Sequence, residues 1–363
     1  MDRVFHIANK AVSDDSSSFV IAEVGHNHQG EIEKCKAIFK AAADAGAHAV
    51  KIQKRDNKTL FTKEMYDGHY DSENAYAATY GAHREFLEFG REEYIELRNY
   101  SNGLGVLFFS TAFDERSADF LEEIDMPAYK IASGDLYNIP LLKKVAKFGK
   151  PMIISTGGAT MEDARRAYNA IMPINRNLCI MQCTSGYPAP YEELNLRVIE
   201  AFRKAFPEVV IGFSSHDSGI SMPLVAYMLG ARVFEKHFTL NRTWKGSDQP
   251  FSLEPGGMRR VVRDLERARM ALGDGVKHPY ASEDGPLSKM VKRIVAARDL
   301  KVGTLLKADD LAFRIPAASK ITADALCPYD VDALVGKVLT CDIAAEDLIT
   351  HATVRAERKA AAG

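Results

Sequence analysis

The sequence predicts an α/β protein built on a (β/α)₈ TIM barrel, and three observations lead to that prediction. Eight apolar runs recur between residues 19 and 238, and amphipathic helical patterns separate them. Continuous apolar runs are typical of parallel strands that helices cover on both faces. Polar residues stand at the C-terminal ends of these runs, where barrel enzymes hold their reactive groups. The pattern therefore predicts an enzyme.

Predicted strands and helices alternate along the chain. The strands cover Phe19–Gly25, His48–Lys54, Val106–Phe113, Tyr129–Ser133, Met152–Gly157, Leu178–Ser185, Val209–His216 and Ala231–Phe238. The helices cover Glu31–Ala45, Arg91–Leu104, Asp114–Ile124, Ile139–Phe148, Met161–Ile171, Leu196–Phe206, Ser221–Leu229 and Gly256–Leu272. Boundary signals support these helices, because Gly46 follows the first as a C-cap and an acidic turn opens the third.

One predicted connection is much longer than an ordinary turn between a strand and a helix. Residues 55–90 contain Tyr66, Tyr70, Tyr76 and Tyr80 among several charges, with no clear strand. Long loops in compact domains are usually functional or disordered. Because this connection follows the second strand, we expect it at the rim that carries the active site of a barrel enzyme.

A change of composition at Gly273–Pro286 predicts a linker. Beyond it the segments are short, which indicates a β-rich module of about 70 residues, near the lower limit for an independent core. We predict a barrel domain over residues 1–275, a linker over 276–290 and the small module over 291–356. A barrel needs about 250 residues, so a chain of 363 residues accommodates this division.

Composition and charge argue against several functional classes. Lys and Arg number 47 against 49 Asp and Glu, so broad affinity for nucleic acid or for an anionic membrane is not expected. The five cysteines lack paired CxxC spacing, which argues against a disulfide framework and predicts a reducing, cytoplasmic location. We find no apolar core of an export signal and no apolar run long enough for a membrane span.

Two histidines end the last two predicted strands. His216 and His237 are too far apart in sequence for helix or finger spacing, but adjacent barrel strands would place them side by side. Two neutral imidazoles with water and substrate oxygens suit an octahedral Mn²⁺-type ion or an open zinc site. The alternative is a pair of hydrogen-bonded histidines at the barrel rim.

Three lysines fall inside apolar strand runs, namely Lys51, Lys130 and Lys236. Lysine is rarely buried without a partner, so three lysines converging on one barrel mouth predict an anion site. The alternative is that each lysine extends to solvent without a function. Hydroxyl side chains at the same strand ends, followed by glycines, would add donors for a phosphate or a carboxylate. The hydroxyls are Thr111, Ser133, Ser155, Thr156, Ser185 and Ser214.

Carboxylates and an amide supply a second kind of chemistry at the same rim. Glu23 ends the first strand, Gln53 ends the second, and Asp248 follows the eighth. Such groups bind polyols or move protons. The alternative for Asp248 is a carboxylate in an ordinary turn. Asn27, in the loop after Glu23, is a further candidate near the ligand.

Ten motifs in order resemble those of sialic acid synthases. They are AEVGHNHQG, AVKIQK, YGAHREFLEF, FFSTAFD, YKIASGDL, ISTGGAT, QCTSGYPAP, GFSSHDSG, FEKHFTL and SDQPFSLEP. The C-terminal module resembles the antifreeze-like (SAF) domain of that family, a β-clip fold. The resemblance implies condensation of phosphoenolpyruvate with an N-acetylated amino sugar, such as N-acetylmannosamine or a 2,4-diacetamido-trideoxyhexose. The product would be a nine-carbon 2-keto acid, released with phosphate.

The resemblance also implies roles for individual residues. His216 and His237 would hold a divalent metal, with Mn²⁺ expected and Mg²⁺ or Co²⁺ as alternatives. Glu23, Glu235, Lys51 and Lys130 would act in catalysis. Phosphoenolpyruvate would be bound by Lys51, Thr111, Lys130, Ser133, Ser155, Ser185 and Ser214. The sugar would be bound by Glu23, Gln53, Tyr187, Asp248 and Arg314. Arg314 would come from the partner subunit of a domain-swapped homodimer.

The sequence departs from the family pattern at three positions. Arg314 precedes Ile-Pro-Ala where the family usually has Pro-Gly, Ser215 precedes His216 where Asp is frequent, and Ser185 stands where Asn is frequent.

Two other functions remain open from the sequence. One is a phosphoenolpyruvate-dependent synthase for another aldose or for a sugar 6-phosphate, and the other is a sugar-binding scaffold without activity.

Overall fold

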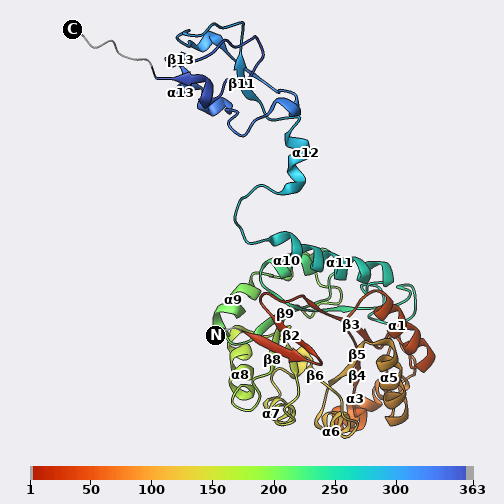
Figure 1. Ribbon diagram of the computed structural model, residues 1–363. Helices are drawn as coiled ribbons and strands as arrows, with labels where there is room; N and C mark the ends of the chain where they lie inside the picture. Colours follow the sequence, from red (N-terminus) through yellow and green to blue (C-terminus); the bar gives the residue numbers. More distant parts are fainter. Residues whose placement is uncertain (1–2, 357–363) are drawn as a thin grey trace. The chain divides into compact units, whose positions relative to one another are not determined.

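A computed structural model describes residues 3–356 and shows two compact units that divide between Gly273 and Asp274. The first unit is a closed barrel of eight parallel strands surrounded by helices (Figure 1). The barrel strands are β3 (Phe19–Gly25), β4 (Ala49–Lys54), β5 (Leu107–Ala112), β6 (Tyr129–Ile131), β7 (Met152–Ser155), β8 (Leu178–Cys183), β9 (Val210–Ser215) and β10 (Val233–His237). Because β10 pairs with both β9 and β3, the predicted (β/α)₈ barrel is confirmed.

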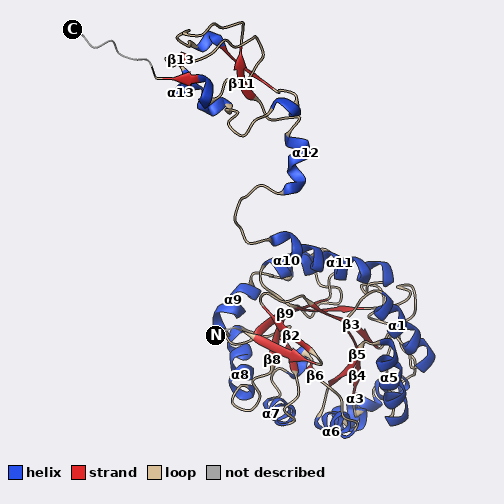
Figure 2. Ribbon diagram, viewed as in Figure 1, coloured by secondary structure: helices blue, strands red, loops and turns tan. Residues whose placement is uncertain are grey.

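Helices connect the strands and cover the outside of the barrel (Figure 2). They are α1 (Ile32–Asp44), α5 (Arg91–Leu104), α6 (Glu115–Glu123), α7 (Ile139–Lys147), α8 (Met161–Ile171), α9 (Val198–Ala205), α10 (Met222–Met228) and α11 (Pro255–Leu272). A large apolar cluster lies between them and the sheet, and includes Val50, Phe108 and Phe234. Each predicted helix is present, and its ends differ from the prediction by at most two residues.

Side chains alternate along every barrel strand between the outer apolar layer and the barrel interior. In β4, Val50 and Ile52 belong to the outer cluster, whereas Ala49 belongs to the inner one. Lys51 and Gln53 therefore share the inner face with Ala49. The register keeps the inner polar residues at similar heights, since Glu23 pairs with Lys51 and Glu235 pairs with Ser214.

An N-terminal hairpin that the sequence patterns did not predict covers the opposite end of the barrel. It consists of β1 (Val4–Ile7) and β2 (Lys10–Ser13), with Phe5 opposite Val12. Phe5, Ile7 and Val12 pack in one cluster with inner residues at the N-terminal ends of the strands. The barrel interior is therefore apolar at the N-terminal ends of the strands, where the hairpin lies, and polar at their C-terminal ends. Ligands can enter only at the polar end.

The long connection after β4 contains three short helices, where the sequence indicated only a loop. They are α2 (Asn57–Leu60), α3 (Lys63–Asp67) and α4 (Tyr80–Phe86). Each has a side-chain N-cap, supplied by Asp56, Thr62 and Thr79 respectively. The connection is thus a packed segment at the catalytic end of the barrel, and it contributes side chains to the cavity there.

The second unit has its own small apolar core, which includes Ile294, Leu326 and Leu339. Its elements are α12 (Asp284–Leu287), β11 (Arg293–Ala296), β12 (Leu311–Arg314), α13 (Val331–Leu334), β13 (Val338–Leu339) and β14 (Val354–Arg355). β11 pairs with β12 and β13 with β14, in antiparallel two-stranded sheets. Within the described part of the chain, no helix has the length and hydropathy that crossing a membrane requires.

Candidate active site

A cavity of about 580 Å³ lies at the C-terminal ends of the barrel strands. It is lined by every barrel residue to which the family resemblance assigns a role: Glu23, Lys51, Gln53, Thr111, Lys130, Ser133, Ser155, Ser185, Tyr187, Ser214, His216, Glu235, His237 and Asp248. These residues come from all eight strands or the loops that follow them. The arrangement matches the position of active sites in barrel enzymes.

Two buried lysines and two buried carboxylates form the floor of the cavity. Lys51 Nζ lies 2.6 Å from Glu23 Oε2 and 2.6 Å from the Thr111 hydroxyl, to which it donates a hydrogen bond. Glu235 accepts from Ser214 Oγ at 3.1 Å and lies 3.4 Å from Lys130 Nζ. Lysines held in this way are pre-positioned for an anion, because their carboxylate partners fix them without filling the cavity.

The two carboxylates have pKa values that move in opposite directions. Burial raises the pKa of Glu23, and although Lys51 opposes it, the result stays above the usual value. Burial also acts on Glu235, but Lys130 and Lys51 outweigh it and lower the pKa to about 2. Pairs of carboxyl groups whose pKa values differ in this way can divide the roles of acid and base between them.

Several of the hydroxyl groups lie around Gly157, where the backbone passes close to the side chains of Ser133 and Ser185. The Gly157 N–H donates to Ser133 Oγ at 2.9 Å, and a Cβ atom at this position would collide with Ser185 Oγ. Ser155 Oγ is buried and has no hydrogen-bond partner among the described residues. Hydroxyls with unused donor capacity beside two lysines suit a phosphate or carboxylate ligand. Thr156, by contrast, donates to the Met181 carbonyl and lies outside this cavity.

The two predicted metal-binding histidines lie next to each other, with ring centroids 5.3 Å apart. His216 Nδ1 donates to the Thr184 carbonyl at 2.8 Å, so Nε2 carries the free lone pair. Burial lowers the pKa of His237 to about 3, which keeps its imidazole neutral. His237 Nδ1 is buried, has no hydrogen-bond partner among the described residues and lies 3.6 Å from Asp248 Oδ2.

These histidines fit a divalent metal with open coordination positions. Neutral imidazole nitrogens are the form that binds metals, and an orphaned buried nitrogen is a site where a cation gains a ligand. Residues 3–356 contain no group of three His, Cys, Asp or Glu side chains placed to enclose an ion. A metal held by His216 and His237 would therefore take its other ligands from water and substrate.

The prediction for Lys236 is wrong. Lys236 is 1 % exposed and donates to the Asp217 carbonyl at 2.6 Å, with the Asp217 carboxylate 3.1 Å away. It lies one residue from both Glu235 and His237, so strand alternation directs its side chain to the outside of the barrel. Ser215 Oγ contacts the same carboxylate. The departure from the family pattern at Ser215 therefore falls in this ion-pair network.

Asn27 is also placed differently from the sequence expectation. Its side-chain amide donates to the Phe238 carbonyl and to Ser252 Oγ, so it ties the loop after β3 to the loops after β10.

Arg314 belongs to the second unit, where it lies 3.0 Å from Glu346 Oε1. Its contact with the sugar stays a prediction.

Among the cavity residues to which sequence reasoning assigned no role, three carry side-chain nitrogen atoms: His26, Arg55 and Arg84. Arg55 follows β4 directly and Arg84 belongs to α4, within the long connection expected at the rim. Strand alternation offered a signal for Arg55, since Lys51, Gln53 and Arg55 are spaced by two. Arg84 belongs to no periodic pattern that the sequence reveals.

Comparison with known proteins assigns both units to families. Residues 38–277 match the NeuB family, and residues 291–355 match the SAF domain. The mouse N-acetylneuraminate-9-phosphate synthase is 37 % identical over 341 residues, which cover 94 % of each chain. The N,N'-diacetyllegionaminic acid synthase of Legionella pneumophila is 34 % identical over 90 % of this chain and 92 % of that protein.

A solved structure has the same fold over most of the chain. It is the N-acetylneuraminic acid (sialic acid) synthetase of Leptospira borgpetersenii, crystallised in complex with citrate, with a TM-score of 0.69 and 32 % identity. The match covers 79 % of this chain and 96 % of the Leptospira chain.

Proposed function

The chain belongs to the NeuB family, and from that premise we propose that it condenses phosphoenolpyruvate with an N-acetylated amino sugar. The products are a nine-carbon 2-keto acid of the sialic or legionaminic type and inorganic phosphate. The observation that carries this proposal is the cavity floor, where Lys51 and Lys130 lie beside two carboxylates with opposite pKa shifts. Such a floor neutralises an anionic substrate and also supplies an acid and a base.

Phosphoenolpyruvate binds to the lysines and the hydroxyls in this proposal. Two ammonium groups and several O–H donors neutralise its phosphate and its carboxylate. The ligands are Lys51, Thr111, Lys130, Ser133, Ser155, Ser185 and Ser214. This arrangement directs the third carbon of phosphoenolpyruvate toward the cavity centre, where the aldehyde of the sugar is held.

The sugar binds through Glu23, Gln53, Tyr187 and Asp248. Gln53 Nε2 donates to Glu23 Oε1 at 2.8 Å, which fixes both side chains before the sugar enters. The Tyr187 ring packs on His216 with a centroid distance of 4.2 Å, so it covers the histidine pair from the loop after β8. Fixed groups of this kind reduce the entropy lost when two substrates meet.

The reaction proceeds by carbon–carbon bond formation and then loss of phosphate. The third carbon of phosphoenolpyruvate attacks the aldehyde carbon, and Glu23, whose pKa burial raises, gives a proton to the aldehyde oxygen. Positive charge develops on the second carbon, where ionised Glu235 stabilises it and accepts a proton from the attacking water. The tetrahedral intermediate then expels phosphate by C–O cleavage, and its hydroxyl proton passes to the departing phosphate, which leaves the 2-keto group.

His216 and His237 would hold the divalent metal, which we propose to be Mn²⁺, with Mg²⁺ or Co²⁺ as alternatives. A bound divalent ion supplies Lewis acidity that polarises a carbonyl oxygen. His237 contributes a neutral nitrogen, and His216 is oriented for this role by its bond to the Thr184 carbonyl.

We propose in addition that two copies form a homodimer in which Arg314 of one copy reaches the sugar site of the other. Arg314 is the one predicted site residue that lies outside the barrel unit, and its side chain is 60 % exposed.

The five cysteines are free thiols, as expected for the cytoplasmic location that we propose.

A sugar panel tests the proposed function. Full-length protein with Mn²⁺ and phosphoenolpyruvate is assayed for phosphate release with N-acetylmannosamine, its 6-phosphate and a 2,4-diacetamido-trideoxyhexose. We expect release only when the metal, phosphoenolpyruvate and one suitable sugar are all present, and loss of release after chelation. Metal binding without turnover of any sugar in a broad aldose panel would contradict the proposal and favour a binding scaffold.

A further inference from the structure

A buried ion pair lies on the outer face of the two strands that carry the paired histidines. It joins Lys236 of β10 to Asp217, which follows β9. Both side chains are buried, and both lie outside the cavity described above. Ser215 lies beside them, and we call Lys236, Asp217 and Ser215 the outer clamp. None of the three residues has a part in the steps proposed above.

Strand alternation places the outer clamp back to back with the histidines. Ser215 and Lys236 are register partners in β9 and β10, so their side chains point to the same side of the sheet. His216 and His237 each follow one of these residues and point to the other side, into the cavity that they line. Asp217 follows His216 and meets Lys236 on the outer side. Each histidine is thus a sequence neighbour of the clamp.

Lys236 contacts the residues on both sides of His216. Its Nζ donates to the Asp217 carbonyl at 2.6 Å and to Asp217 Oδ1 at 3.1 Å. It also donates to Ser215 Oγ at 3.3 Å, and the Ser215 hydroxyl donates to Asp217 Oδ1. The three donors of one ammonium group therefore hold both neighbours of His216.

The clamp joins the two segments where strand pairing ends. The last register pair of β9 and β10 is Ser215 with Lys236, and β9 ends at Ser215. His216 therefore lies one residue beyond the ladder, whereas His237 is still part of β10. The hydrogen bond from Lys236 Nζ to the Asp217 carbonyl continues the connection past the ladder. It fixes the backbone of His216 relative to that of His237.

Stability alone does not account for a charged pair at this place. Buried ion pairs are often no more stabilising than apolar side chains of the same volume. A charged pair adds direction, because its short contacts specify one arrangement of the two segments. A metal with two protein ligands depends on that arrangement, since water and substrate supply its other ligands and the histidines alone set its place.

We propose that the outer clamp sets the separation of His216 and His237 and thereby the affinity of the site for its divalent ion. This inference rests on the proposed function, which places the ion on these two histidines. Lys236 and Asp217 point away from the cavity and act through the histidines, so they are positioning residues. Because Lys236 Nζ contacts both Ser215 and Asp217, the carboxylate can stand on either side of His216.

Titration with Mn²⁺ alone tests the clamp without turnover. Free Mn²⁺ is measured by electron paramagnetic resonance in the presence of full-length protein. We expect Lys236→Met to raise the Kd by on the order of 10- to 100-fold, as for other groups that support a metal-binding histidine. Lys236→Met/Asp217→Asn should show the same loss and fold more readily, because it leaves no unpaired buried charge. His237→Ala, which removes a proposed ligand, should abolish binding.

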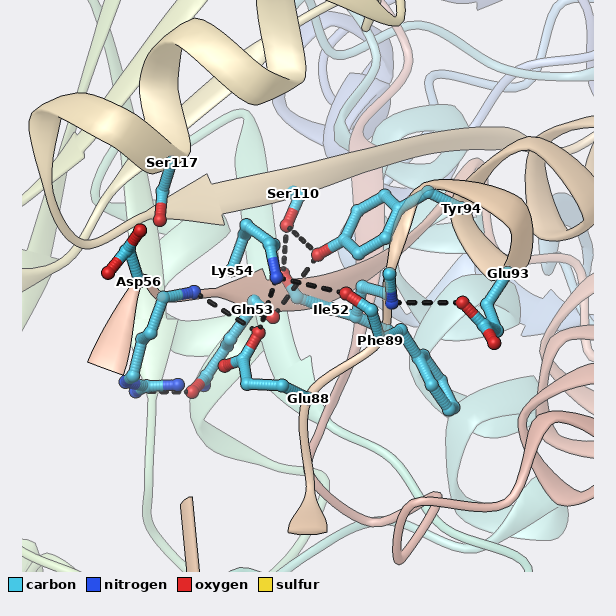
Figure 3. Close-up of polar contacts among 12 residues, drawn as sticks. Ile52, Gln53, Lys54, Asp56, Glu88, Phe89, Glu93, Tyr94, Ser110 and Ser117 are labelled. Carbon is cyan, nitrogen blue, oxygen red and sulfur yellow. Dashed lines mark hydrogen bonds and ion pairs between the residues drawn. The ribbon is translucent and has the colours of Figure 1, made fainter. Parts of the chain in front are cut away.

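A second lysine pair provides the matched control. Lys54 Nζ donates to Glu88 Oε2 and to the Phe89 carbonyl, each at 2.9 Å (Figure 3). This largely buried lysine also joins a carboxylate to a backbone carbonyl, but it is a sequence neighbour of neither histidine. Lys54→Met should lower the thermal midpoint and leave the Kd for Mn²⁺ unchanged. Equal increases of the Kd in Lys54→Met and Lys236→Met would overturn the proposal.

Moving the carboxylate gives a readout that a general structural role would not produce. Asp217→Ser should weaken Mn²⁺ binding as Lys236→Met does, because Lys236 loses its charged partner. Ser215→Asp/Asp217→Ser should restore the affinity to near that of wild type, since the new carboxylate also reaches Lys236 Nζ. Failure of this exchange to restore any affinity would contradict the clamp.

Kinetics separate failure of the clamp from failure of the proposed function. In Lys236→Met, half-maximal phosphate release should need on the order of 10- to 100-fold more Mn²⁺, with kcat near that of wild type at saturating metal. An unchanged Kd, with a fall in kcat that Mn²⁺ does not restore, would overturn the clamp and leave the synthase intact. If no sugar turns over, the titrations still decide the clamp. Absence of Mn²⁺ binding by wild type would overturn it whether or not a sugar turns over.

Discussion

Glu23 and Glu235 lie on neighbouring strands at the barrel mouth, and their lysine partners make them chemically different. Glu235 lies near both lysines, whereas the raised pKa of Glu23 reflects burial that a single lysine does not offset. An enzyme that adds a nucleophile to an aldehyde and then water to a cation needs a proton donor first and an acceptor afterwards. In the proposed mechanism Glu23 is the donor and Glu235 the acceptor.

The identity of most site residues could be predicted from the sequence, because polar residues at apolar strand ends are conspicuous. The error at Lys236 was avoidable, since a lysine between two inward residues must point outward. His26 and Arg84 could not be found in this way, because neither belongs to a barrel strand. They and Arg55 lie in three segments, and only the fold brings their nitrogen atoms together.

His48, which does not line the cavity, makes the free energy of unfolding depend on pH. His48 Nδ1 accepts a hydrogen bond from the Val20 N–H at 2.9 Å, and burial lowers its pKa to about 4 from 6.5. Between pH 6.5 and 4 the unfolded chain binds a proton that the folded chain excludes, so the free energy of unfolding falls as the pH falls. We expect a loss on the order of 1 to 3 kcal/mol from this residue. Below pH 4 its contribution becomes constant.

His48→Asn isolates this contribution, because the Asn Oδ1 can accept the same N–H and does not titrate. Thermal unfolding followed by circular dichroism at pH 7, 6, 5 and 4 should show a smaller loss for the variant than for wild type. His278→Asn, at an exposed position, is the control. Identical pH dependence in wild type and His48→Asn would exclude His48 as the source.

At the scale of elements, the strands and helices of the barrel follow from pattern and capping. All eight strands were predicted, and the errors are one or two extra residues at their ends. The N-terminal hairpin was missed because its strands have four residues each, too few for alternation to be evident. Helices α2 to α4 have at most seven residues, which is less than two full turns of amphipathic pattern.

The turn after β7 offers a test of how elements position the hydroxyl groups. Gly157→Ala would place a Cβ atom against Ser185 Oγ and 2.9 Å from Ser133 Oγ. The side chains must move, and small displacements of binding groups reduce rates by about 10- to 100-fold. We therefore expect a fall of that order in kcat/KM for phosphoenolpyruvate, measured by phosphate release, with an unchanged thermal midpoint.

Gly103→Ala is the matched substitution, because a Cβ atom there meets no neighbour within 4 Å. Its site in α5 should give slightly higher stability, by about 1 kcal/mol, and wild-type kinetics. Wild-type kinetics in Gly157→Ala as well would show that Ser133 and Ser185 do not contribute to binding phosphoenolpyruvate.

At the scale of the whole molecule, the chain combines a barrel that holds nearly all the predicted chemistry with a small unit that holds one arginine. Sequence reasoning could identify the second unit from its composition and its motifs. The place where Arg314 acts depends on assembly, and no pattern within a single chain specifies that.

Arg314→Ala tests whether the second unit takes part in binding the sugar. We expect the apparent KM for the sugar to rise on the order of tenfold, because a charged hydrogen bond is lost, with a much smaller change for phosphoenolpyruvate. Glu346→Ala removes the ion-pair partner of Arg314 and keeps the arginine, so it should leave both constants unchanged. Equal increases of both constants in Arg314→Ala would contradict a sugar-binding role.

The hairpin below the barrel has a consequence for biosynthesis. Phe5, Ile7 and Val12 emerge from the ribosome before the barrel strands, yet their apolar partners include Val210 and Val233. The hairpin therefore has no complete surface to cover until almost the whole barrel has been translated, and strand β3 waits equally long for β10. These early segments expose apolar side chains throughout translation, so we expect them to be where chaperones engage the nascent chain.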